Sequence, residues 1–234
     1  MPIRGVLFDI DDTLFDYSTS EAAGILAHLR AERLLDRFPD ADAARNLWRD
    51  VMVRNYTRFL DGELSHSGQQ HARVHEFLNH IGRHTDDAAA WFAGYRAHYA
   101  AAWTAFDDTV PALNRLAPGY RLGVVSNSST DHQRRKLDAL GLSGYFADAV
   151  VCSAEHGAAK PAASIFEAGC AALDLAPHEV GYVGDRYEID AAGAAEAGLR
   201  GYWLDRRRES TDVPVMDGIR VIHSLDALPD ALTD

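Results

Sequence analysis

Two aspartates near the start of the chain lie close enough in sequence to act on one ligand. Asp9 and Asp11 occur in the stretch VLFDIDDTLFD, residues 6–16, directly after a short apolar run. Two carboxylates about 4 Å apart repel each other by roughly 4 kcal/mol at an effective dielectric constant of about 20. A cation bound between them removes this cost, so the stretch predicts a metal site.

Three further groups of polar residues follow apolar runs or open the next segment. They are Ser126 with Asn127, Lys160 just before a proline, and Asp185 with Asp190. Because the carboxyl ends of parallel strands meet at one edge of a sheet, we expect these groups to lie near the first two aspartates. Carboxylates, a hydroxyl, an amide and an ammonium would together bind a divalent cation and an anionic oxygen group. Hard oxygen ligands of this kind favour Mg²⁺.

Each group also has a plainer explanation. Aspartates favour turns and helix N-termini without any ligand. Ser126 and Asn127 could cap a helix that begins near residue 130, and Lys160 could be a solvated loop residue. The joint occurrence of all these groups behind apolar runs favours a common site.

The apolar pattern indicates which elements carry these residues. Residues 3–8 form a continuous apolar run, as expected for a strand buried on both faces. Four helical segments without a strand come next. They are one behind a capping box of Ser18 and Glu21, one capped by Asp40 and running to residue 60, one at residues 67–81 and one at residues 85–103.

After residue 106, apolar runs alternate with helical or turn-rich segments. These runs occupy residues 120–127, 147–153, 180–185, 200–205 and 219–224. Such alternation is typical of a parallel sheet with crossover helices. The predicted fold is α/β: a doubly wound parallel sheet built from residues 1–15 and 107–234, with a four-helix cap domain, residues 16–106, inserted after the first strand. An insertion at that end of the sheet is expected to lie over the ligand site.

The segment between the two later aspartates has to be irregular if both are to reach one ion. Asp185 and Asp190 are separated by RYEI, residues 186–189. Residues five apart lie about 140° out of register on an ideal α-helix. We therefore expect a loop or turn there.

Composition limits the classes of partner. The formal net charge of −12 argues against nonspecific nucleic-acid binding, which depends on Lys and Arg neutralising phosphates. No apolar run approaches the roughly 20 residues that span a bilayer, so we expect no membrane association. The two cysteines, Cys152 and Cys170, and the lack of a signal segment indicate buried reduced thiols in a cytoplasmic protein. The eleven histidines form no partner set for a metal, and the charged surface suits a monomer or a homodimer.

With its motifs in this order, the chain resembles the haloacid dehalogenase-like (HAD) hydrolase superfamily, in the subgroup with a helical cap inserted after the first motif. The first to fourth motifs read DIDDT, SN, KP and GDRYEID. The resemblance implies an HAD-like Rossmannoid core, Mg²⁺ as the cofactor and a small-molecule phosphate ester as the substrate. The chain departs from the family at two places. Family members often have an acidic residue and a proline after KP, whereas this chain reads KPAAS from Lys160 onward. Position 186 is Arg where a small polar residue is common, and Arg186 could contact substrate or pair with Glu188.

The resemblance also implies a role for each residue. Asp9 would be the nucleophile that forms an aspartyl phosphate, and Asp11 the general acid and base. Ser126 and Lys160 would hold the phosphoryl oxygens, with Asn127 positioning the loop. The implied metal ligands are Asp9, the backbone carbonyl of Asp11, and Asp185, with Asp190 nearby.

The second aspartate selects among the family's chemistries. Members that resemble the dehalogenases carry a tyrosine where this chain has Asp11, so Asp11 points to phosphate esters. The expected activity is that of a phosphatase acting on a small soluble phosphomonoester. A phosphomutase or phosphonatase of the same family stays open, as does a non-enzymatic regulator that binds a phosphorylated ligand.

Overall fold

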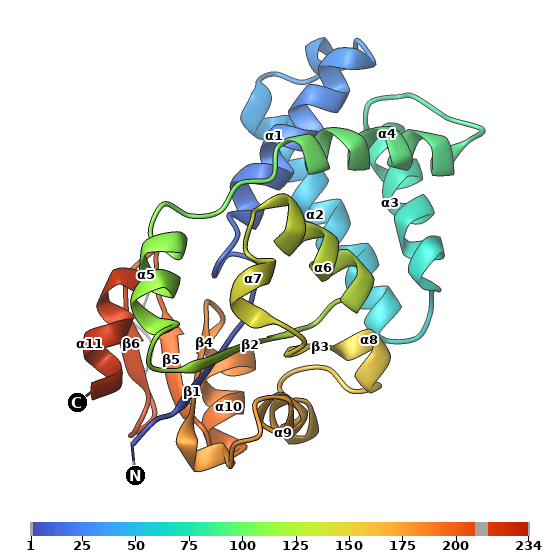
Figure 1. Ribbon diagram of the computed structural model, residues 1–234. Helices are drawn as coiled ribbons and strands as arrows, with labels where there is room; N and C mark the ends of the chain where they lie inside the picture. Colours follow the sequence, from blue (N-terminus) through green and yellow to red (C-terminus); the bar gives the residue numbers. More distant parts are fainter. Residues whose placement is uncertain (1, 209–214, 234) are drawn as a thin grey trace. The chain divides into compact units, whose positions relative to one another are not determined.

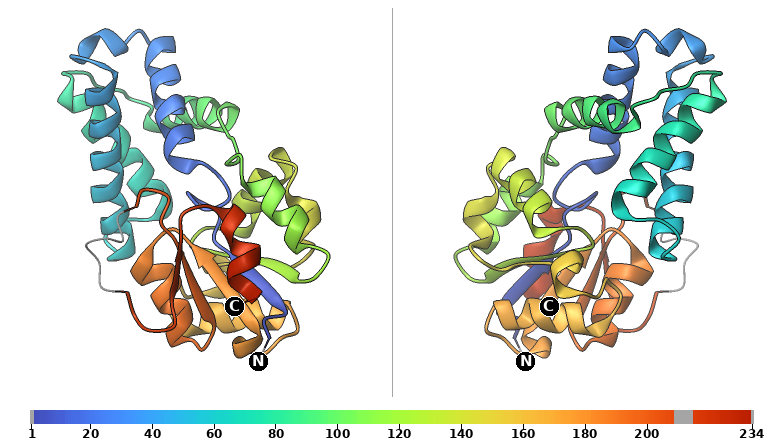
Figure 2. Two further views of the ribbon diagram at one scale, coloured as in Figure 1. Left: turned by 90° about the vertical axis from the view of Figure 1, so that its left-hand side faces the viewer. Right: turned by 90° about the vertical axis from the view of Figure 1, so that its right-hand side faces the viewer.

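The computed structural model describes residues 2–208 and 215–233, except for the side chains of residues 60 and 66. The chain divides into two compact units. One comprises Met1–Asp16 and Thr104–Asp234, and the other comprises Tyr17–Trp103. The chain leaves the first unit after its first strand and returns before helix α5 (Thr109–Leu116), as Figures 1 and 2 show.

The first unit is built on a six-stranded sheet in the order β3-β2-β1-β4-β5-β6 (Figure 1). Every neighbouring pair of strands is parallel. The strands are β1 (Gly5–Phe8), β2 (Arg121–Ser126), β3 (Val150–Cys152), β4 (Val180–Gly184), β5 (Arg200–Leu204) and β6 (Arg220–Ile222). All residues of β1 and β4 are buried, which explains their continuous apolar sequence. The predicted doubly wound α/β fold is confirmed.

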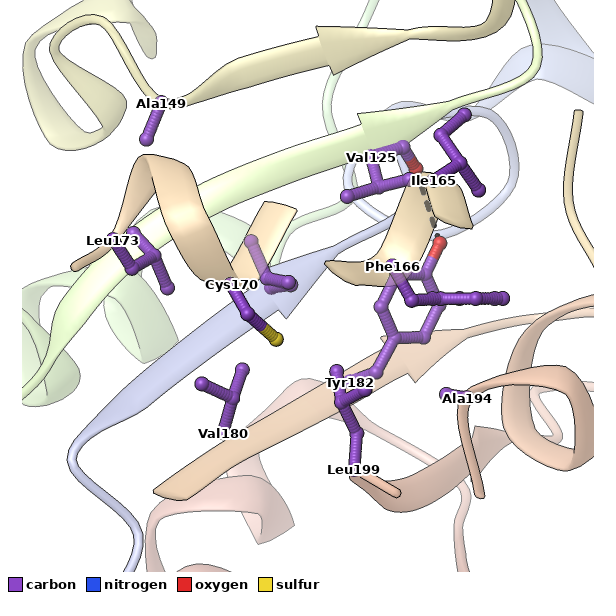
Figure 3. Packing of buried hydrophobic residues seen from close by; sticks show 11 residues of the cluster. Val125, Ala149, Ile165, Phe166, Cys170, Leu173, Val180, Tyr182, Ala194 and Leu199 are labelled. Carbon is purple, nitrogen blue, oxygen red and sulfur yellow. Dashed lines mark hydrogen bonds between the residues drawn. The ribbon is translucent and has the colours of Figure 1, made fainter. Parts of the chain in front are cut away.

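Helices connect the strands and cover the sheet. They are α5 (Thr109–Leu116), α6 (Thr130–Ala139), α7 (Ser143–Phe146), α8 (Ser153–His156), α9 (Ala163–Ala172), α10 (Gly193–Glu196) and α11 (Leu228–Thr233). Figure 3 shows side chains of α9, among them Phe166 and Cys170, packed against Val125 and Tyr182 of the sheet. Gly169 permits this close approach, because a Cβ there would lie 2.6 Å from a methyl of Val125. Both cysteines are buried free thiols, as predicted.

The second unit consists of four helices inserted between β1 and β2, as the sequence predicted. They are α1 (Tyr17–Ala31), α2 (Ala41–Leu60), α3 (His66–His80) and α4 (Ala88–Ala101). Asp40 caps α2 by accepting a hydrogen bond of 2.8 Å from the backbone N–H of Ala43. Asp87 caps α4, so this helix begins three residues later than predicted.

The predicted capping box at the start of α1 is wrong. The helix begins at Tyr17, so Ser18 is already inside it. Glu21 instead points into the core of the helical unit and pairs with Arg73 at 2.8 Å, and the guanidinium of Arg73 lies 3.7 Å from the ring centroid of Trp48. A buried ion pair with an aromatic ring beside it holds Glu21 more firmly than a solvated cap would.

Within the described residues, none of the helices is both long enough and apolar enough to cross a membrane.

Candidate active site

The predicted site residues lie at the carboxyl ends of three adjacent strands. Asp9 directly follows β1, Ser126 ends β2, and Asp185 directly follows β4. Phe8 is level with Val124 on one side and with Val183 on the other, so the three strands end at the same edge. The backbone N–H of Asp9 donates to the carbonyl oxygen of Val183 at 2.9 Å and extends this register by one residue.

A buried lysine stands at the centre of this edge. The ammonium of Lys160 donates to Asp9 Oδ1 and Asp190 Oδ1, each at 2.7 Å, and to the hydroxyl of Tyr182 at 2.8 Å. These three oxygens use all the protons that an ammonium can donate. Tyr182 in turn donates to the carbonyl oxygen of Val125 at 3.0 Å, the contact drawn in Figure 3. Lys160 is therefore a buried residue that connects three side chains of the site, and its interpretation as a solvated loop residue is excluded.

Three carboxylates surround a point that suits a cation. One oxygen each of Asp9, Asp185 and Asp190 lies within 4.8 Å of the others. Burial, with Asp190 and Asp11 nearby, raises the pKa of Asp9 to about 7 despite the opposing effect of Lys160. Burial, together with Asp9 and Asp190, raises the pKa of Asp185 to about 8. Crowded hard oxygen ligands with raised pKa values fit a divalent cation such as Mg²⁺, which would neutralise their mutual repulsion.

The segment between Asp185 and Asp190 differs from the loop that the sequence predicted. Tyr187–Ala192 forms a π-helix, so most of RYEI is helical. Asp185 precedes this helix, and the register of an α-helix therefore does not apply to the pair. Gly184 is required for the approach of Asp190, because a Cβ at residue 184 would lie 2.3 Å from Asp190 Cγ. The backbone N–H of Arg186 donates to Asp190 Oδ2 at 3.0 Å.

Asn127 connects the loop of Lys160 to the end of β2. Its side-chain amide donates to the carbonyl oxygen of Lys160 at 3.0 Å and accepts from the N–H of Lys160 at 2.7 Å. Ser126 is buried and accepts a hydrogen bond of 2.9 Å from the side chain of Gln133. The residue preceding α6 is Ser129, so neither Ser126 nor Asn127 caps that helix.

Two residues that the sequence did not single out hold Asp11. Lys136, on α6, forms an ion pair with Asp11 Oδ1, and Gln133, one turn earlier, donates to Asp11 Oδ2 at 3.0 Å. Burial would raise the pKa of Asp11, but the charge of Lys136 and the hydrogen bonds from Lys136 and Gln133 outweigh it and lower the pKa. A signal was present, since both polar residues lie beside buried Leu137 in a helix next to the second motif.

The structure shows the surroundings of two arginines, Arg186 and Arg206. Arg186 is exposed, and within the described chain it makes no ion pair with Glu188. The run DRRRES, residues 205–210, has three arginines flanked by acids and by sequence alone is expected to be a solvated loop, but Arg206 pairs with Asp108 at 2.9 Å. Residues 209 and 210 lie outside the described residues.

Comparison with known proteins gives the same family as the motifs. A family model described as haloacid dehalogenase-like hydrolase matches residues 3–198. The chain is 30% identical to glyceraldehyde 3-phosphate phosphatase of Methanopyrus kandleri, over 99% of this chain and 100% of that protein. It is 31% identical to ribulose-1,5-bisphosphate 5-phosphatase of Halopiger xanaduensis, over 98% of this chain and 97% of that protein.

A solved structure supports the fold. The HAD-hydrolase YfnB of Bacillus subtilis, determined with bound magnesium, superposes with a TM-score of 0.83 at 21% sequence identity. The alignment covers 100% of both chains, so the helical insertion and the sheet are both present in that protein.

Proposed function

The chain belongs to the haloacid dehalogenase-like hydrolases, and we propose that it is a Mg²⁺-dependent phosphatase that acts on a small soluble phosphomonoester through an aspartyl-phosphate intermediate. One observation carries the proposal. The carboxylate of Asp9 lies against the ammonium of Lys160 and within 4.8 Å of the carboxylate oxygens of Asp185 and Asp190. A nucleophile, a fixed positive charge and a set of metal ligands therefore meet at one point.

The proposed metal ligands are Asp9, Asp185, Asp190 and the backbone carbonyl of Asp11. When bound there, Mg²⁺ would neutralise charge on the phosphoryl group and on the attacking carboxylate. Relatives with phosphatase names and a relative with bound magnesium support this assignment.

The remaining polar residues would bind the phosphoryl oxygens. Lys160 supplies a positive charge, and Ser126 supplies a hydroxyl on the adjacent strand end. The side chain of Asn127 hydrogen-bonds to the backbone carbonyl and the backbone N–H of Lys160, which fixes the position of this residue relative to β2. Fixed charges aimed at the reacting group lower the barrier without having to reorganise during the reaction.

The proposed reaction has two displacements. A carboxylate oxygen of Asp9 attacks phosphorus and the bond from phosphorus to the ester oxygen breaks. Asp11, which takes up a proton when the anionic substrate binds beside it, gives this proton to the departing alkoxide. Water then attacks the aspartyl phosphate, Asp11 takes a proton from that water, and the bond from Asp9 to phosphorus breaks. Inorganic phosphate and the free carboxylate of Asp9 result, so each step is easier than direct hydrolysis.

We further propose a substrate among small sugar phosphates and a cytoplasmic monomer or homodimer, with residues 16–106 acting as the cap domain. The two relatives at about 30% identity are named for three- and five-carbon sugar phosphates. These two names differ in the sugar phosphate, so a panel is the appropriate test.

The proposal is tested by phosphate release from 4-nitrophenyl phosphate and from a panel of sugar phosphates. The assay uses protein with Mg²⁺ and with EDTA, for the parent and for Asp9→Asn. Asp148→Asn is the matched control, because Asp148 is exposed and its contact with Arg134 is 3.8 Å long. We expect turnover with Mg²⁺ in the parent and the control, and loss in Asp9→Asn by at least about 10³-fold, since the covalent step is removed. Turnover that survives EDTA or the Asp9 change would overturn the proposal.

A further inference from the structure

Helix α6 directs two buried polar side chains at Asp11. Gln133 and Lys136 are three residues apart and therefore lie on one face of the helix. The exposed fraction is 0% for Gln133 and 1% for Lys136. Lys136 pairs with one carboxylate oxygen of Asp11, and Gln133 donates to the other at 3.0 Å. Both oxygens of Asp11 are thus held from one helix.

Packing alone does not explain these two residues. Burying an ammonium is costly unless a partner compensates it, and an apolar side chain of similar length would fill the same space without that cost. Lys136 has its carboxylate partner and also lies 4.4 Å from the ring centroid of Phe15. Because the buried ammonium of Lys136 pairs with the carboxylate of Asp11 at the strand ends, we infer that the pair serves the function of Asp11.

Gln133 adds a second constraint, because it joins two parts of the site. Its side-chain nitrogen donates to Asp11 at 3.0 Å and to the hydroxyl of Ser126 at 2.9 Å. Its side-chain oxygen is buried and has no hydrogen-bond partner among the described residues. The orientation of the Gln133 amide is therefore set by Asp11 and Ser126, and its side-chain oxygen is left without a hydrogen bond to any described residue.

We propose that Lys136 and Gln133 are positioning residues, which hold the Asp11 carboxylate at the place from which it transfers a proton to the departing ester oxygen. Gln133 also sets the spacing between Asp11 and Ser126. This proposal rests on the proposed phosphatase function. It adds two residues of α6 to the machinery of the first displacement.

The proposal makes a prediction that a merely structural role does not. When the bond from phosphorus to an alkyl oxygen breaks, the alkoxide must take a proton from Asp11. When 4-nitrophenyl phosphate reacts, the stable 4-nitrophenolate leaves without that proton. Misplacing Asp11 should therefore slow cleavage of alkyl esters much more than cleavage of the aryl ester.

The experiment compares kcat/KM for the sugar phosphate of the panel that the parent hydrolyses best and for 4-nitrophenyl phosphate, because kcat/KM reports the steps up to departure of the leaving group. The variants are Lys136→Met and Gln133→Leu, which remove the polar atoms and keep most of the side-chain volume. Arg135→Met is the control, since Arg135 is exposed on the same helix and, among the described residues, its ion pair is with Asp131, at 2.9 Å. For Lys136→Met we expect kcat/KM to fall about 100-fold on the alkyl ester and less than about 5-fold on the aryl ester.

The outcomes separate the two proposals. Equal losses on both esters, or no loss on either, in an active and Asp9-dependent enzyme would refute positioning and leave the phosphatase function intact. No turnover in the parent would refute the phosphatase function and the positioning proposal with it.

Folding can be controlled in the same experiment. The Asp11 side chain keeps 36% exposure, so water can solvate it when Lys136 is replaced, and we expect Lys136→Met to fold. If thermal unfolding shows that it does not, Gln133→Leu carries the test alone, with a smaller preferential loss on the alkyl ester expected.

Discussion

At the scale of single residues, Lys160 balances the negative charge of the site. It is buried and in contact with Asp9 and Asp190, and these carboxylates hold its pKa well above the usual value although burial alone would lower it. The site of the free protein therefore gathers three acidic side chains around one ammonium, whose charge offsets part of theirs. The proposed metal would supply the remaining positive charge.

Replacing Lys160 tests this balance. Without Mg²⁺, Lys160→Met should lower the free energy of unfolding by about 3–5 kcal/mol, because buried carboxylates lose their partner. Saturating Mg²⁺ should then stabilise the variant more than it stabilises the parent. Urea unfolding with and without Mg²⁺ measures both quantities, and Arg135→Met controls for loss of a positive charge elsewhere. Equal gains from Mg²⁺ in variant and parent would contradict this account.

At the scale of elements, β4 and the π-helix after it must approach each other closely. A residue with a side chain at position 184 would collide with Asp190, since the added Cβ would lie 2.3 Å from Asp190 Cγ. The segment Tyr187–Ala192 begins two residues after Asp185, which lets both carboxylates face the same point. The glycine is therefore part of the geometry of the proposed metal site.

Gly184→Ala should move Asp190 away from its place. We expect a loss of about 1–3 kcal/mol in the free energy of unfolding, and a Mg²⁺ affinity at least about 10-fold weaker. Isothermal titration with Mg²⁺ and urea unfolding give the two values. Gly119→Ala is a matched control, because a Cβ at Gly119 meets nothing within 4 Å. If Gly184→Ala binds Mg²⁺ as tightly as the control does, the required approach of Asp190 is refuted.

At the scale of the whole sheet unit, a partly buried carboxylate joins segments that are distant in sequence. Asp108, just before α5, accepts hydrogen bonds from Arg206 at 2.9 Å, from the Ser224 hydroxyl at 2.8 Å and from the backbone N–H of Leu225 at 2.9 Å. Burial would raise the pKa of Asp108, but these hydrogen bonds and the charge of Arg206 outweigh it and lower the pKa. The ionised form is therefore favoured by folding.

The pH dependence of stability follows from that direction. A carboxyl whose pKa is lowered by folding stabilises the protein above its ordinary pKa, and this contribution is lost as pH falls through the folded value. Asp108→Asn should lower the free energy of unfolding by about 1–3 kcal/mol at pH 7, and the difference should shrink below about pH 4. Urea unfolding across this range checks it, with exposed Asp107→Asn as the control. A difference independent of pH would show that charge is not the cause.

Local pattern was sufficient for the order of elements. Continuous apolar runs predicted all six strands, because strands buried on both faces need apolar residues throughout. Two local predictions differ from the structure. Glu21 was expected to cap α1 and instead pairs with the distant Arg73, and the segment before Asp190 was expected to be a loop or turn and is mostly π-helical.

The sequence by itself determined the α/β sheet, the helical insertion, the family and the residues at the strand ends, because each depends on local periodicity or on motifs of a few residues. Only the tertiary structure decided which side chains meet. Lys160 contacts Asp9, Asp190 and Tyr182. Asp11 is held by Gln133 and Lys136. These contacts join residues from separate strands and helices. Such contacts depend on how α6 and the strands pack. The spacing of residues along the chain does not determine how close these side chains lie in the folded protein.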